Sequence, residues 1–169
     1  MASWISRRIF ISNSSFHNNH FDGIALYDSE DIIISNFMTF ENIGGAGISL
    51  DNNLKQVLFN NGFVKNNGDV GIFARDSEEI NFHDVMISRN SSHGVFLSHK
   101  SIATNTGVKR LFFQGCSFLG NNGYGLWLAS PTSESPSNTV IGCVFENNTL
   151  GCIKEDSGAY LLQASNICR

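Results

Sequence analysis

One pattern recurs six times along this chain of 169 residues and constrains its fold more than any other feature. Each copy has an apolar anchor, a turn rich in Asn and Gly, and then two apolar residues that flank a variable one. The anchors lie 24, 24, 23, 31 and 27 residues apart, and the longest step contains an insertion from Ser98 to Val108. A Gly lies seven positions after each anchor, except in the sixth copy, where Cys152 occupies that position. The anchors are Phe16, Phe40, Val64, Ile87, Phe118 and Phe145.

The apolar residues within each copy alternate with a period of two, so the copies predict short strands joined by turns. A unit of about 24 residues cannot bury its own apolar face and must stack on its neighbours. Leucine-rich repeats are excluded because the Leu-x-x-Leu-x-Leu-x-x-Asn spacing is absent. Helical repeats are excluded because no apolar stripe with a 3.6-residue period occurs.

This pattern resembles the parallel β-helix repeat that pectate lyases, alginate epimerases and lyases, and phage tailspikes share, and the resemblance covers residues 9–153. It implies an all-β fold: a single-stranded, right-handed parallel β-helix (solenoid) of about six coils. We expect one domain over residues 1–169, with an N-terminal cap at 1–8 and a C-terminal coil or cap at 154–169. Six coils rise only about 29 Å, which is also compatible with a fragment of a longer β-helix.

Stacking the copies assigns their residues to columns. The anchors form one inward column, and the two apolar positions after the Gly form two more. The middle column contains Ile24, Ile48, Ile72, Val95, Leu126 and Ile153, and the last contains Leu26, Leu50, Ala74, Leu97 and Leu128. The turn predicts an asparagine ladder of Asn19, Asn67, Asn90, Asn121 and Asn148, which Ile43 interrupts. Asn suits this position because it tolerates left-handed backbone and bonds turn amides.

The four cysteines leave their pairing open. Cys116 and Cys143 share an inward column two residues before their anchors. Adjacent coils are about 4.8 Å apart, within the Cα range of a disulfide, although two buried thiols fit the same positions. Pairing of Cys152 and Cys168 cannot be assigned. No Cys-x-x-Cys or zinc-like His spacing occurs, so we expect no metal site of that kind.

Charge and hydropathy restrict the partners. A net charge of -4 argues against nucleic acid, and no Lys/Arg run predicts an anionic membrane surface. No apolar run approaches the roughly 18 residues that span a bilayer. The N-terminus lacks the apolar stretch of a signal peptide. Either the protein is intracellular or a signal has been removed, and our expectation is a secreted or cell-surface protein.

A β-helix fills its interior with side chains, so function is expected on an outward face. The outward column between the two apolar positions places Phe73, Phe96 and Trp127 in a contiguous row, which we call the aromatic stripe. Exposed apolar surfaces of this kind mark ligand grooves or partner contacts. Aromatic faces stack on sugar rings, so the stripe predicts a polysaccharide-binding platform. The competing interpretation is coverage by a loop, by a second subunit or by the rest of a longer β-helix.

The turn after this strand places ionisable residues beside the stripe. Its columns predict a catalytic or binding cluster that supplies an acid, a base and a cation. Uronate chemistry needs these parts: a cation for the C6 carboxylate, a base for the C5 proton and an acid opposite it. The cluster contains Tyr27, Asp28, Asp51, Asn52, Arg75, Asp76, Ser98, His99 and Lys100.

Roles within this cluster follow from side-chain chemistry. His99 or Tyr27 is the candidate base or acid, and Arg75 or Lys100 is the candidate carboxylate neutraliser. Asp51 and Asp76 either orient them or hold Ca²⁺, and Asn52 adds a substrate contact. The competing interpretation is that Asp, Asn and Ser occupy these positions because turns favour them. His93 is interpreted as a turn residue.

No catalytic signature of the resembling families is present. The Asp-Pro-His motif of alginate C5-epimerases, the paired aspartates and Gly-His-Gly of polygalacturonases, and the Arg-x-Pro-x-x-Arg of pectate lyases are all absent. Two functions therefore stand together. One is an epimerase- or lyase-like enzyme that works on a uronate polysaccharide. The other is a non-catalytic glycan-binding or assembly segment of a tailspike- or adhesin-like surface protein.

Overall fold

The computed structural model of the protein describes residues 1–98, 107–129 and 138–169. In these residues the regular secondary structure consists of β-strands alone. No helix long and apolar enough to cross a membrane occurs in this part of the chain. The strands are β1 (Ala2–Trp4), β2 (Arg7–His17), β3 (Ile24–Tyr27), β4 (Glu30–Phe40), β5 (Ile48–Asp51), β6 (Lys55–Lys65), β7 (Ile72–Arg75), β8 (Glu78–Ser88), β9 (Val95–Ser98), β10 (Phe112–Gln114), β11 (Ser117–Leu119), β12 (Tyr124–Leu128), β13 (Asn138–Ile141), β14 (Val144–Glu146), β15 (Gly151–Glu155), β16 (Leu161–Ala164) and β17 (Ile167–Cys168).

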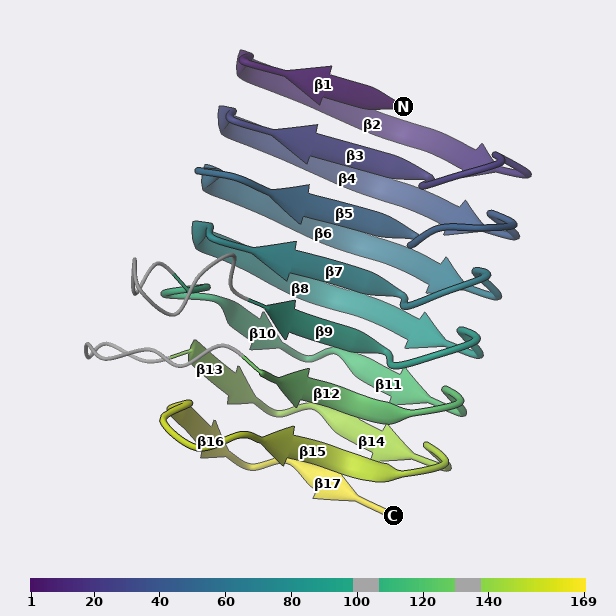
Figure 1. Cartoon of the computed structure of the whole chain (residues 1–169), viewed down its shortest axis with the longest axis vertical. Helices are drawn as coiled ribbons and strands as arrows, with labels where there is room; N and C mark the ends of the chain where they lie inside the picture. Colours follow the sequence, from purple (N-terminus) through teal and green to yellow (C-terminus); the bar gives the residue numbers. More distant parts are fainter. Residues whose placement is uncertain (99–106, 130–137) are drawn as a thin grey trace.

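The strands stack into two parallel sheets that run the length of the molecule (Figure 1). The first sheet, which we call the short-strand sheet, has the order β1-β3-β5-β7-β9-β12-β15. The second contains the 11-residue strands β2, β4, β6 and β8, followed by the shorter pairs of the later coils. Each coil contributes one strand to the first sheet and then crosses to the second. This is the predicted solenoid of about six coils spaced by about 24 residues.

Residues in the left-handed backbone conformation (positive φ) let each coil bend around the core. Asn13, Asn36, Asn61 and Asp84 lie in the middle of the 11-residue strands, and their φ angles are between 50° and 53°. In the next two coils Gly115 and Gly142 take the same conformation, where the strand divides into two. Asn, Asp and Gly tolerate positive φ better than other residues, so the sequence places the bend at one height in each coil.

The interior is a stack of apolar side chains. Phe59, Phe82 and Phe113 are fully buried and pack ring on ring, with centroids 4.8 Å apart at both steps. Phe118 and Phe145 form a second parallel pair at 4.3 Å. The two predicted columns of the short-strand sheet, headed by Ile24 and Leu26, are confirmed by the strand register. Burial of each large side chain contributes about 2 to 3 kcal/mol, so core stacking stabilises every coil.

The asparagine ladder is continuous, and the predicted interruption at Ile43 is wrong. Asn42 takes the ladder position in that coil: its side-chain amide accepts from Asn19 at 2.7 Å and donates to Asn67 at 2.8 Å. The same bond continues at 2.9 Å from Asn67 to Asn90, from Asn90 to Asn121 and from Asn121 to Asn148. Each side-chain oxygen also accepts the backbone N–H of the preceding ladder residue.

The same shift of one residue corrects the anchor column. Phe16 pairs with Thr39, not with Phe40, and Thr39 pairs with Val64. Thr39 is fully buried, and its hydroxyl donates to the carbonyl of Gly47 at 2.9 Å and accepts from Asn42 at 3.0 Å. Phe40 lies outside the core, half-buried and stacked on His17 with centroids 4.7 Å apart. The turn from Asn42 to Gly47 has one extra residue, which restores the 24-residue step in the next strand.

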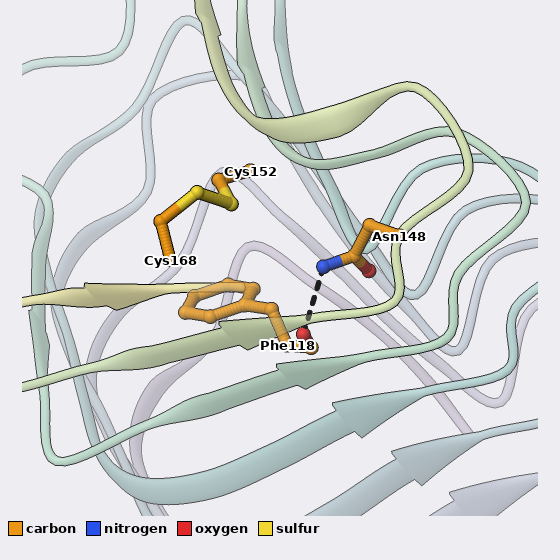
Figure 2. The surroundings of a disulfide bond; sticks show 4 residues. All are labelled: Phe118, Asn148, Cys152 and Cys168. Atoms are coloured by element: carbon orange, nitrogen blue, oxygen red, sulfur yellow. Dashed lines mark hydrogen bonds between the residues drawn. A yellow bond between two sulfur atoms is a disulfide. The ribbon is translucent and has the colours of Figure 1, made fainter.

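Two cysteines are free and two are paired. Cys116 and Cys143 lie buried on adjacent coils as thiols, one of the two predicted states. Their mutual hydrogen bond and their burial raise the pKa of the Cys116 thiol. Cys152 of β15 and Cys168 of β17 form a disulfide that joins the two sheets in the last coil. Figure 2 draws its surroundings, where the Asn148 side chain donates to the Phe118 carbonyl at 2.8 Å.

Candidate functional site

The aromatic stripe lies on the outward face of the short-strand sheet, as the sequence predicts. Phe73 of β7 pairs in register with Phe96 of β9, which pairs with Trp127 of β12. Ring centroids are 6.1 Å apart between the two phenylalanines and 4.7 Å between Phe96 and Trp127. All three side chains are half-buried. The rings partly cover one another along the solenoid axis, so the stripe contributes to packing as well as to the surface.

Lys154 continues the stripe on the next coil and covers one side of Trp127. It pairs with Trp127 in the β12–β15 register, and its Nζ lies 4.1 Å from the centroid of the indole. Phe96 comes from the coil on the other side, so Trp127 has neighbours both above and below. Asp156 accepts from the indole Nε1 at 3.1 Å and pairs with Lys154 at 3.5 Å. One carboxylate thus holds both the aromatic ring and its cation.

The first predicted ionisable column is also in register. Tyr27, Asp51, Arg75 and Ser98 face one another on β3, β5, β7 and β9. The guanidinium of Arg75 binds the buried carboxylate of Asp51 in a bidentate pair. This hydrogen bond raises the pKa of Arg75, and burial opposes the effect. The proposed carboxylate neutraliser therefore already has a protein carboxylate as its partner.

The second predicted column lies in the turns that follow. Asp28, Asn52 and Asp76 all have positive φ, between 44° and 57°, so turn geometry accounts for their residue types. Asn53, an extra residue in this turn, donates from its side chain to Asp28 at 3.0 Å. A cavity of about 180 Å³ adjoins Asp76, Asn53 and Lys55. Among the described residues, no group of three or more His, Cys, Asp or Glu side chains is placed to hold a metal ion.

Two of the predicted catalytic residues cannot be placed. His99 and Lys100 lie outside the residues that the structure describes. The placed members of the cluster are Tyr27, Asp28, Asp51, Asn52, Arg75, Asp76 and Ser98. They line the edge of the short-strand sheet next to Phe73, and the Arg75 guanidinium lies 5.7 Å from the centroid of that ring.

The structure adds a second group at the other edge of the stripe, which sequence reasoning missed. His93 contacts Trp127 edge-on, with centroids 4.9 Å apart, and stacks on Tyr124 at 5.8 Å. Lys154 approaches the same Tyr124 ring at 5.8 Å. The sequence does place His93 and Tyr124 in one column, because each directly precedes the repeat Gly. His93 was interpreted as a turn residue, because the ring contacts depend on side-chain direction, which the column does not predict.

His93 is held as a neutral imidazole. Its Nδ1 accepts the backbone N–H of Tyr124 at 2.9 Å, which leaves Nε2 to carry the proton. Burial lowers the pKa of His93, Lys154 lowers it further, and Asp69 opposes them. The ring also packs against Gly123, where an added Cβ would lie 2.4 Å from Nδ1. The group can therefore donate a hydrogen bond at neutral pH.

A groove of about 630 Å³ lies on the opposite sheet, away from these residues. Phe10, Ile33 and Leu58 are among the residues that line it, and Phe10 is largely exposed. The sequence predicts no function for this face, and none of the predicted site residues that the structure describes lines the groove.

Solved structures with a similar fold include carbohydrate-active enzymes. The periplasmic alginate epimerase AlgG matches with a TM-score of 0.66 at 16% identity, over 95% of this chain and 39% of that one. A point mutant of AlgG matches with a TM-score of 0.70 at 16% identity, over 97% and 46%. The catalytic domain of a GH87 alpha-1,3-glucanase matches with a TM-score of 0.51 at 10% identity, over 96% and 46%. This chain spans less than half the length of these proteins, and at such identities the likeness concerns the fold alone.

A search of curated proteins finds no match. The sequence profile described as the right handed beta helix region matches residues 3–106, which is more than half of the chain. Its boundaries include the first four coils, where the repeat is most regular. The register of parallel strands, the buried columns and the asparagine ladder agree with this match. The chain belongs to the right-handed β-helix family.

Proposed function

We propose that this chain binds an extended polysaccharide along the aromatic stripe and acts on uronate-type chains as an epimerase or lyase does. The observation that carries the proposal is the stripe itself: Phe73, Phe96 and Trp127 stand in register on three successive strands of one outward face. Aromatic side chains are the usual partners for the apolar faces of sugar rings, and a repeating surface suits a repeating ligand.

The proteins with similar folds support the carbohydrate class. AlgG is an alginate epimerase, and the glucanase structure was determined with tetrasaccharides. Both have solenoid folds that match nearly the whole of this chain. A long polymer can follow the coils of such a fold, because each coil repeats the same surface about 4.8 Å further along.

The uronate part of the proposal uses the ionisable column beside the stripe. Arg75 neutralises the C6 carboxylate through the guanidinium N–H groups that Asp51 does not use, so the buried Asp51 keeps its partner. Tyr27 and His99 form the acid–base pair: one removes the C5 proton as base, and the other supplies a proton as acid. In epimerisation that proton goes to the opposite face of C5, and in elimination it goes to O4 of the leaving sugar as the C4–O bond breaks. Asp76 orients these groups, and Lys100 is the alternative cation to Arg75.

The alternative function is non-catalytic: a glycan-binding or assembly segment of a tailspike- or adhesin-like surface protein. The bidentate pair of Arg75 and Asp51 favours it, because a guanidinium with a buried partner is a structural group first. Under this alternative the stripe binds sugar or a neighbouring protein surface, and no bond in the sugar changes.

Location follows from the same proposal. A secreted, periplasmic or cell-surface protein meets polysaccharide directly, and AlgG is a periplasmic protein. The disulfide between Cys152 and Cys168 supports this location, because disulfides persist in oxidising compartments.

Alginate, pectin and a neutral glucan, each with CaCl₂ or with EDTA, test both functions. An enzyme produces unsaturated ends that absorb at 235 nm or changes the C5 epimer ratio seen by NMR. Tyr27→Phe abolishes that product with little effect on binding. The Trp127→Ala variant weakens binding at least tenfold, and Phe63→Ala, an exposed aromatic on the other sheet, leaves it unchanged.

Binding without product in every mixture favours the non-catalytic alternative. The carbohydrate proposal fails if no glycan in the set binds to the wild-type chain. It also fails if Trp127→Ala and Phe63→Ala reduce binding equally, because the stripe then has no special role.

A further inference from the structure

We propose that Lys154 and Trp127 form a subsite for one anionic sugar residue, and that Asp156 occupies the anion position until such a residue arrives. This inference rests on the proposed polysaccharide function and assigns part of the stripe to charge recognition. The subsite lies at the end of the stripe away from β7, on β12 and β15 and just after β15.

The Asp156 carboxylate binds two partners, Trp127 and Lys154. One of its oxygens accepts from the Trp127 indole at 3.1 Å, and the other pairs with Lys154 at 3.5 Å. The side chains of Lys154 and Asp156 are 39% and 41% exposed, so solvent and ligands can reach both. An exposed ion pair of this length is weak, and a ligand carboxylate or sulfate can replace the aspartate at the ammonium group.

The Lys154 ammonium group lies over the Trp127 ring. The ammonium of Lys154 lies 4.1 Å from the indole centroid, over the side of Trp127 that Phe96 does not cover. An anion that draws Lys154 off the ring uncovers a face of the indole. The same sugar residue can then stack on that face, so charge recognition and ring stacking occur together.

His93 adds a hydrogen-bond donor beside the Trp127 ring. His93 meets Trp127 edge-on, and its Nδ1 already accepts from Tyr124, which leaves the Nε2 proton for a ligand oxygen. In contrast, Arg75 at the other end of the stripe is held by a buried partner. The charge that is easiest to redirect to a ligand on this face, among the described residues, is therefore that of Lys154.

Trp127 can report the event directly. The chain has two tryptophans, and Trp4 is exposed, so Trp4→Phe leaves Trp127 as the single indole. In that background we titrate three oligosaccharides of equal length: an oligouronate, a sulfated oligosaccharide and a neutral one. Indole emission and calorimetry measure the affinity of each. The two charged ligands separate carboxylate from sulfate recognition.

Two substitutions move the affinity in opposite directions. Lys154→Met lowers the affinity for the charged oligosaccharide about tenfold, the loss expected for one charge-assisted hydrogen bond. Asp156→Asn keeps an acceptor for the indole but removes the competing charge, so it raises that affinity several-fold. Neither changes the affinity for the neutral ligand by more than about twofold. Lys65→Met is the matched control, because Lys65 also lies over an aromatic ring, that of Phe40 on the other sheet.

The subsite is refuted if Lys154→Met and Asp156→Asn leave the affinity for both charged ligands unchanged while the neutral ligand binds. The wider proposal survives that result. If none of the three ligands binds, the subsite and the polysaccharide function fail together. Circular dichroism of each variant confirms the fold, and the charge-reversed Lys154→Glu must bind the charged ligands less tightly than Lys154→Met.

Discussion

Each buried asparagine of the ladder links adjacent coils through several side-chain hydrogen bonds. Asn90 is 1% exposed, and its side chain makes four bonds. It accepts from the backbone and side chain of Asn67 at 3.1 and 2.9 Å, and it donates to Asn121 at 2.9 Å and to Val64 at 3.3 Å. Each of these groups lies in the interior, where no water replaces a lost partner.

Asn90→Ala is expected to lower the free energy of unfolding by about 3 kcal/mol or more. It leaves the buried backbone and side-chain donors of Asn67 without their acceptor, and it removes one of the two donors to the Asn121 side-chain oxygen. Urea denaturation measures the change. Asn122→Ala is the matched control, since Asn122 is exposed. Among the described residues its side chain donates to Ser91 and accepts from Thr149, and both bonds are long, at 3.4 Å. Equal losses in the two variants would contradict the ladder.

At the scale of the element, the register of β4 decides which residue enters the core. Alternation along β4 buries Ile32, Ile34, Phe37 and Thr39, so Phe40 must face outward. The aromatic residue at the repeat position predicts the opposite assignment. Hydrogen bonds of the Thr39 hydroxyl to Gly47 and Asn42 compensate for its polarity.

Two alanine substitutions test this register. Phe118→Ala removes a fully buried ring from the anchor column and is expected to cost about 3 to 5 kcal/mol. Phe40→Ala removes a half-buried ring outside the core, and we expect a cost of about 1 kcal/mol. Thermal and urea unfolding compare them. A loss for Phe40→Ala as large as that for Phe118→Ala would restore Phe40 to the core.

At the scale of the whole molecule, each described strand pairs with strands of the adjacent coils, so stability is a sum of local terms. The last coil lacks the deep burial of the others: Leu162, Ile167 and Cys168 are exposed. The disulfide between Cys152 and Cys168 links its two sheets across 16 residues. This covalent link holds β15 and β17 together where their side chains are only partly buried.

Replacing both Cys152 and Cys168 by Ala is therefore expected to cost about 3 kcal/mol, the value for a loop of this length. The loss is expected to be local. Hydrogen exchange should speed up at β15, β16 and β17, while β4, β6 and β8 keep their protection. A reductant should reproduce the effect in the wild type and in Cys116→Ala. Uniform loss of protection along the chain would refute the nearest-neighbour description.

Much of the site could be predicted because the repeat carries it. Phe73, Phe96 and Trp127 were assigned to one outward column, and the same register placed Tyr27, Asp51 and Arg75 beside them. The pairing of Arg75 with Asp51 was not predictable, since a column gives adjacency but not partners. His93 was interpreted as a turn residue, and no role was predicted for Tyr124, Lys154 or Asp156, because ring contacts and ion pairs depend on side-chain direction across coils.

The sequence by itself determined the solenoid, the six copies, the inward columns of the short-strand sheet and the position of the aromatic stripe. These follow from period and spacing, which are properties of the chain order alone. Only the tertiary structure decided the slip at Thr39, the unbroken ladder through Asn42, the disulfide of the last coil and the group around Trp127. Each of these depends on which atoms of neighbouring coils meet, and a shift of one residue in one turn is enough to change that.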